Sequence, residues 1–395
     1  MAQQHLDPTD PTTGPVTGDA LAGYLRAQAT EFLRALRLHR ETGGASGAEG
    51  TVDAALALRR SARRISASLH TFRPLLDAEW SEEMRPELAW LSGTLALEHA
   101  CEARLERLLL ALHRLSGAGV LPARTDGVAG RRAASPAGAV EKSRANGVAV
   151  GSRSAAARGA APEGERAGGS RGRVGTAAPE TAGPPSAPAT PERGNLTVGA
   201  AKAGALLERQ LTLARTRAHS TALQALGSSR FHAVADKVAL LASEVPLTAA
   251  ATAADLRPLA RAAQERLTDA VTALPLVTAG HPYNAEALIH GLSPDPAPHP
   301  QDAPWHQVRL LLRLHRYAVE VLRGGNSTMD VRLLAAGQAL NRHRDASEAA
   351  AAAAQAARTP RIAPATAYAL GVLHADQRHE VEAARFAFQR AWQNT

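Results

Sequence analysis

The chain contains very few of the residues that form cross-links or favour sheets. Cys101 is the single cysteine among 395 residues, so no disulfide can form within the chain and a reducing compartment is expected. Aromatic residues make up only 3% of the sequence, although hydrophobic residues reach 45%. The core must therefore consist mainly of Leu, Ala and Val, a composition that favours packed helices over sheets.

Long apolar runs are also missing. No stretch approaches the roughly 20 apolar residues that a membrane-spanning helix needs. The first fifteen residues, MAQQHLDPTDPTTGP, have neither a basic start nor an apolar run, so no signal peptide is expected. These absences predict a protein of the cytoplasm that has no membrane partner.

Lysine is scarce, although the chain is basic. Three lysines stand beside 42 arginines, and the net charge is +8 with a pI of about 10.4. Such basicity indicates an acidic partner, such as nucleic acid or polyphosphate. However, residues 121–200 hold 11 basic and 6 acidic residues, a net +5 that leaves only +3 for the rest. The preference for arginine also fits a high-GC genome, so it is not by itself evidence for phosphate recognition.

Composition divides the chain into four parts. Residues 1–18 are polar and rich in Pro, Thr and Asp, which predicts a disordered tail. Helical periodicity follows over residues 19–116 and resumes over residues 201–395. Between them, residues 117–200 are rich in Gly, Ala, Pro, Ser and Arg and contain almost no large apolar side chains. Such a segment cannot bury enough surface to offset its chain entropy, so the sequence predicts an all-α fold with a long disordered insertion.

A helix predicted around residues 305–317, WHQVRLLLRLHRY, carries cations along one side. Its basic residues follow one another at intervals of 3, 4 and 3, which places them on one stripe: His306, Arg309, Arg313 and Arg316. The opposite side is apolar and includes Val308, Leu312 and Ala318. A helix that packs with one side and aligns cations on the other requires an anion, or a row of carboxylates, opposite the cations.

Residues 55–72 repeat this arrangement in the first half of the chain. Apolar residues recur at intervals of 3 and 4, and beside them run Arg59 and Arg63, with Arg64 one position further on. Placing Arg59 on Arg309 also places Arg63 on Arg313. The pattern predicts a duplicated helical module built around a polyanion.

Both segments resemble the hallmark motifs of the CHAD domain, the conserved histidine α-helical domain. The resemblance covers roughly residues 18–116 and 201–395. The matching positions are Arg59, Arg63 and Arg64 in the first segment, and His306, Arg309, Arg313, Arg316 and Tyr317 in the second. The first segment is degraded, because Leu56 stands where the family has its histidine and Ser66 where it has an arginine.

The resemblance implies an all-α module of two helical bundles related by a pseudo-twofold internal repeat. Its matching residues would bind inorganic polyphosphate, or a similar linear polyanion, without catalysis. No cofactor and no metal site are expected, and nucleic acid is not expected to bind specifically. Polyphosphate granules are then one place in the cytoplasm where the protein would be found. The degraded first motif leaves an alternative open, in which the bundle is a scaffold for an unknown protein partner and has lost polyanion binding.

Motifs that would indicate an enzyme are incomplete. His343, Arg344 and Asp345 spell the HRD of a kinase catalytic loop, but Ala350 stands where that motif needs its asparagine. His374 and His379 have helical spacing, but no third metal ligand is evident. The sequence therefore predicts no catalytic residues. A solvated basic face remains a second interpretation of the stripe on residues 306–316.

Overall fold

A computed structural model describes residues 16–43, 48–117, 191–281, 285–292, 299–324 and 330–393. Within these ranges the regular elements are helices, which confirms the predicted all-α class. The α-helices are α1 (Gly18–Gly43), α2 (Ala48–Thr71), α3 (Ala78–Leu115), α4 (Pro191–Leu226), α5 (Ser229–Ser243), α6 (Arg257–Thr272), α7 (Leu276–Ala279), α8 (Ala285–Gly291), α9 (Ala303–Leu322), α10 (Val331–Ala357) and α11 (Pro364–Gln393). The internal repeat stays a prediction.

The chain divides into two units. One unit joins residues 1–119 with residues 190–395, and the other holds residues 120–189. The second unit lies outside the described residues, as do most of the predicted N-terminal tail and of the predicted disordered insertion. The helices on either side of the insertion therefore belong to one folded unit.

The helix α4 begins earlier than the sequence indicated. It starts at Pro191, whereas the predicted insertion extended to residue 200. Gly199 lies so close to α11 that a Cβ atom there would stand 2.2 Å from the carbonyl oxygen of Ala365. At Gly199, α4 thus fits closely against the start of α11, and only a glycine allows this approach.

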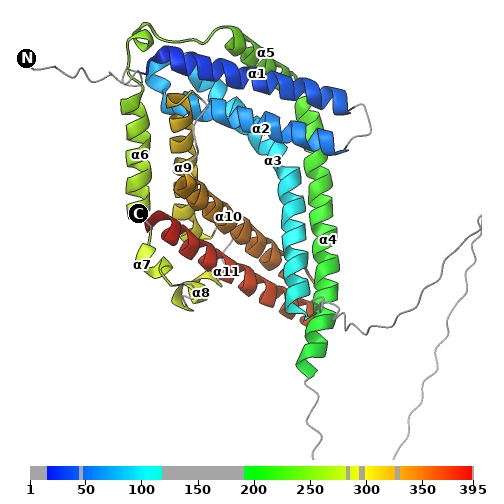
Figure 1. The fold of residues 1–395 in the computed structure, drawn as a ribbon. Helices are drawn as coiled ribbons and strands as arrows, with labels where there is room; N and C mark the ends of the chain where they lie inside the picture. Colours follow the sequence, from blue (N-terminus) through cyan, green and yellow to red (C-terminus); the bar gives the residue numbers. More distant parts are fainter. Residues whose placement is uncertain are drawn as a thin grey trace, which may run out of the picture. The chain divides into compact units, whose positions relative to one another are not determined.

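The helices α3 and α4 lie side by side, and α10 and α11 pack against each other nearby (Figure 1). The sequence allowed one or two helices up to residue 116, and the structure has one helix of 38 residues. Alanines of α10 allow its close packing with α11, and several of them are fully buried: Ala346, Ala349, Ala350, Ala353 and Ala356. These alanines of α10 therefore contribute to the contact with α11 inside the protein.

The apolar sides of α2 and α9 form parts of the core, as their periodicity predicted. In α2 the buried residues are Leu58, Ala62, Ile65 and Leu69, each with no exposed surface. In α9 they include Val308, Leu312 and Ala318, of which none exposes more than 2%. Pro304 lies in the first turn of α9, where its missing N–H group has no cost. Because both helices bury their apolar side, the basic stripe of each helix lies on the side that is only partly buried.

A buried carboxylate connects the start of α9 with α10 and α11. Asp302 is fully buried, and its Oδ2 accepts a hydrogen bond of 2.8 Å from Arg378 while its Oδ1 accepts one of 2.7 Å from Arg385. From α10, Ser347 donates a hydrogen bond of 2.5 Å, and His343 Nε2 lies 3.5 Å from Oδ1. Burial would raise the pKa of Asp302, but hydrogen bonds from His343 and Arg378 outweigh it and hold that pKa well below its usual range.

The substitution Asp302→Asn tests this anchor. It leaves Arg378 and Arg385 buried without their shared carboxylate, and removing one partner of a buried ion pair typically costs about 3–5 kcal/mol. We expect the free energy of unfolding, measured by chemical denaturation, to fall by that amount. The control is Asp53→Asn, which neutralises an exposed carboxylate on α2. Equal stability of the two variants would contradict the assignment.

Candidate functional site

The two basic stripes meet where α2 packs against α9. Arg59 and Arg63 of α2, and Arg309 and Arg313 of α9, are all half-buried. In the described part of the chain none of the four forms an ion pair with a carboxylate. We call this group the bare arginine cluster. The stripe on α9 is therefore not fully solvated, because Arg309 and Arg313 are half-buried and lie near cations of α2.

Electrostatics shows that the four arginines act on one another. Burial lowers the pKa of Arg63 to about 9, and repulsion from Arg59 and Arg313 adds to the effect. Burial also lowers the pKa of Arg309 to about 10, with repulsion from Arg313 and Arg344. The pKa values of Arg59 and Arg313 are lowered in the same direction, again first by burial. All four guanidiniums remain charged at neutral pH, so the cluster holds excess positive charge in a partly desolvated place.

Two donors of the cluster have no acceptor. The Nε atoms of Arg59 and Arg309 are buried and form no hydrogen bond. Arg309 uses one of its other nitrogens, Nη1, in a long contact of 3.4 Å with the side-chain oxygen of Asn341. A buried donor without a partner has a free-energy cost, which an anion could remove.

Arg344 on α10 is a neighbour of the cluster that the sequence analysis missed. Its charge lowers the pKa values of Arg59, Arg309 and Arg313. It is itself paired with Asp345, and it lies 3.9 Å from Glu348. Arg344 is the middle residue of the HRD triplet, and nothing in its spacing along the chain places it beside the stripes. Only the packing of α10 on α9 brings it there.

Arg64 does not share the unpaired state of the cluster. Its Nε donates a hydrogen bond of 2.8 Å to Oε2 of Glu320, and its guanidinium lies over the ring of Tyr317, 5.4 Å from the centroid. Tyr317 is half-buried on α9 beside Arg313 and Arg316. The structure thus brings Tyr317 to the edge of the cluster, whereas it places Arg64 in an ion pair.

The remaining predicted residues lie at the two ends of the α9 stripe. His306 is half-buried near the start of the helix, and its ring meets that of buried His343 edge to face at 5.5 Å. Burial lowers the pKa of His306. Arg316 is half-buried one turn after Arg313 and contributes to the repulsion that Arg313 experiences. His306 therefore carries less charge at neutral pH than the arginines between it and Tyr317.

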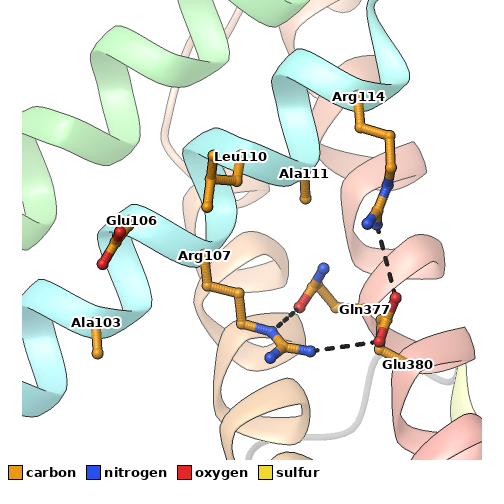
Figure 2. Close-up of a pocket in the computed structure, with 8 residues that line it drawn as sticks. All are labelled: Ala103, Glu106, Arg107, Leu110, Ala111, Arg114, Gln377 and Glu380. Carbon is orange, nitrogen blue, oxygen red and sulfur yellow. Dashed lines mark hydrogen bonds and ion pairs between the residues drawn. The ribbon is translucent and has the colours of Figure 1, made fainter. Parts of the chain in front are cut away.

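A hollow of about 360 Å³ lies elsewhere, between α3 and α11 (Figure 2). It also contains arginines, but they are paired. Arg107 donates a hydrogen bond of 2.6 Å to Gln377, and Arg114 lies 3.8 Å from Glu380 (Figure 2). Its mixed charges make this hollow a poor site for a polyanion, in contrast to the bare arginine cluster.

Metal binding and membrane insertion would need features other than arginine stripes. Among the residues with defined placement, no group of three His, Cys, Asp or Glu side chains could hold a metal ion. Within the same ranges no helix is long and apolar enough to cross a membrane.

Comparisons with known proteins identify the family that the sequence motifs indicated. The model of the CHAD domain family matches residues 27–354. A solved structure described as PptA from Streptomyces chartreusis is 63% identical in sequence, and the match covers 96% of this chain and 100% of that one, with a TM-score of 0.69. A comparison with curated proteins gives no match. The resemblance inferred from the two basic motifs is confirmed.

The bare arginine cluster should reduce the stability of the protein without its ligand. In the variant Arg63→Met the apolar stem is kept and the charge is removed, so repulsion and desolvation are both relieved. Since one pKa unit corresponds to about 1.36 kcal/mol and the residue is only half-buried, we expect stabilisation of roughly 1–3 kcal/mol. The measurement is the melting temperature in a buffer free of phosphate. Arg60→Met, at an exposed position of α2, is the control, and a lower melting temperature for Arg63→Met would contradict the expectation.

Proposed function

Because the chain belongs to the CHAD family, we propose that it binds inorganic polyphosphate, or a similar linear polyanion, as a non-catalytic module. The observation that carries this proposal is the bare arginine cluster, in which Arg59, Arg63, Arg309 and Arg313 face one another across two helices without carboxylate partners. Such a group of cations is unfavourable alone and becomes favourable when an anion lies between its members.

The geometry of arginine suits a phosphate chain. Each guanidinium is planar and presents several donors, so it can form two parallel hydrogen bonds with the oxygens of one phosphate. Arginines one helical turn apart, such as Arg309 and Arg313, could then contact different phosphates of the same chain. Partial burial strengthens these interactions, because the effective dielectric constant is lower than in bulk water.

The carboxylates closest to the cluster argue against a catalytic role. Glu320 binds Arg64, and Asp345 and Glu348 both lie against Arg344. Carboxylates held by arginines are poor general bases and poor metal ligands, and hydrolysis of a phosphoanhydride needs one or the other. We therefore propose that the protein holds its ligand and does not cleave it. Phosphate release from polyphosphate in the presence of Mg²⁺ would contradict this proposal.

The alternative function, a scaffold for another protein, has less support. A scaffold could use the alanines of α10 for close contact with a helix of a partner protein. These alanines are instead buried within the chain, where α10 packs against α11. The loss of the first histidine to Leu56 removes one donor and leaves the four arginines in place. The proposal locates the protein in the cytoplasm, and at polyphosphate granules where these form.

The double variant Arg309→Ala/Arg313→Ala tests the proposal. We expect its affinity for long-chain polyphosphate to fall by at least tenfold, because each charge-assisted hydrogen bond lost is worth roughly 1.5–3 kcal/mol. The dependence of log K on log salt concentration should become less steep, since by analogy with single-stranded nucleic acid each phosphate contact contributes about 0.7 to the slope. Titrations at two salt concentrations measure both effects, with heparin and duplex DNA as competitors.

The matched control is Arg60→Ala/Arg342→Ala, which removes the same charge from exposed positions of α2 and α10. It should keep most of the affinity. If the two double variants bind equally and are equally helical, the bare arginine cluster is not the binding site. If the parent protein does not bind at low salt, the proposed function fails.

Binding should also depend on pH through His306. The usual pKa of a histidine is about 6.5, and burial lowers the pKa of His306 below this value. His306 is therefore mostly neutral at pH 7 and gains charge as the pH falls below about 6.5. A protonated His306 adds a donor beside Arg309, so affinity should increase as the pH falls from 6.5 toward 5. Titrations across this range should show the increase in the parent and a smaller one in His306→Gln. The same increase in both proteins would assign the effect to another group.

A further inference from the structure

A carboxylate stands at one end of the bare arginine cluster. Glu320 lies on α9, one turn beyond Arg316, and it binds Arg64 of α2 through both of its oxygens. The distances are 2.8 Å from Nε to Oε2 and 3.4 Å from Nη2 to Oε1. The family motif includes Arg64, but in this chain its donors are directed at a residue of the protein. Arg63, its neighbour on α2, forms no such pair.

A third helix holds Glu320 in this position. The hydroxyl of Tyr24 on α1 donates a hydrogen bond of 3.0 Å to Oε2 of Glu320. Tyr24 is buried, and the Arg64 and Glu320 side chains expose only 23% and 18% of their surface. The guanidinium of Arg64 also lies over the ring of Tyr317. The pair is thus built into the contact of α1, α2 and α9, and it does not resemble a mobile surface ion pair.

We propose that Glu320 is a specificity-determining residue that closes this end of the polyanion site by occupying Arg64 in place of a phosphate. The inference rests on the proposed function, because it concerns the extent of the same site. A bound chain contacts the four arginines of the cluster and stops before Arg64. Glu320 therefore sets how many cations the ligand can reach.

Charge and geometry both lead to this conclusion. A phosphate that approached Arg64 would have to displace a half-buried carboxylate that holds two contacts with Arg64 and one with Tyr24. It would also meet the negative charge of Glu320, and repulsion between like charges is strong in a partly buried place. At another border of the cluster, Asp345 and Glu348 hold Arg344 in a similar way. In the described part of the chain, Arg64 and Arg344 at the edges of the site are paired with carboxylates, and the four arginines of the bare arginine cluster are not.

The substitution Glu320→Gln tests the inference. It keeps the shape of the side chain but removes its charge, so Arg64 becomes available to the ligand. We expect the affinity for long-chain polyphosphate to rise roughly tenfold at low salt, as for one further charge-assisted contact. The slope of log K against log salt concentration should steepen by about 0.7. Tyr24→Phe, which removes only the hydroxyl that holds Glu320, should give a smaller gain of the same sign.

Two controls separate release of Arg64 from a general change of charge. Asp53→Asn removes one negative charge from an exposed position of α2 and should not reproduce the gain. In a double-mutant cycle, Glu320→Gln is added to Arg64→Ala, where the freed arginine is missing. The gain from Glu320→Gln should then disappear, because it depends on Arg64.

Each outcome decides one of the two proposals. If the parent binds and folded Glu320→Gln binds no better than Asp53→Asn, Glu320 is a structural partner of Arg64 only and the inference is wrong. A gain in affinity from Glu320→Gln that persists in the Arg64→Ala variant would also show that the inference is wrong. If the parent does not bind but Glu320→Gln does, the inference holds and the proposed function of the parent fails. If neither binds, both proposals fail.

Discussion

Repulsion among half-buried arginines is the constraint on which the rest of this structure depends. Arg59, Arg63, Arg309 and Arg313 lie at the contact of α2 and α9 without carboxylate partners, and their lowered pKa values follow from burial and from one another. The apolar sides of both helices must hold this contact together. A polyanion between the helices would remove the repulsion, so ligand binding and stability are expected to be coupled.

Three groups of arginines in and around the site differ in their carboxylate partners. Arg378 and Arg385 share the buried Asp302, and this network anchors the start of α9 to α11. Arg64 and Arg344 stand at borders of the site, each bound to a carboxylate. Among the described residues, no carboxylate forms an ion pair with the bare arginine cluster that lies between them. The net charge of +8 does not distinguish these groups. The placement of acidic residues therefore defines the site as much as the arginines do.

Several features could be predicted from the sequence because they depend on neighbours along the chain. Helical period alone indicated the buried sides of α2 and α9. The cap of α5 is equally local, because the side chain of Ser228 accepts a hydrogen bond from the N–H of Phe231 three residues later. The start of α4 was not predicted, because residues 191–200 resemble the insertion in composition. At Gly199 this helix closely approaches the start of α11, which is a contact between segments far apart in the sequence.

The sequence by itself determined the all-α class and the two cation stripes, since both follow from spacing within single helices. It could not decide which arginines are free to meet a ligand. Arg64 is paired with a carboxylate 256 positions away, and Arg385 with one 83 positions away. The charge state and availability of an arginine depend on groups that folding brings near from distant parts of the chain. For this reason only the tertiary structure separated the bare arginine cluster from the paired arginines around it.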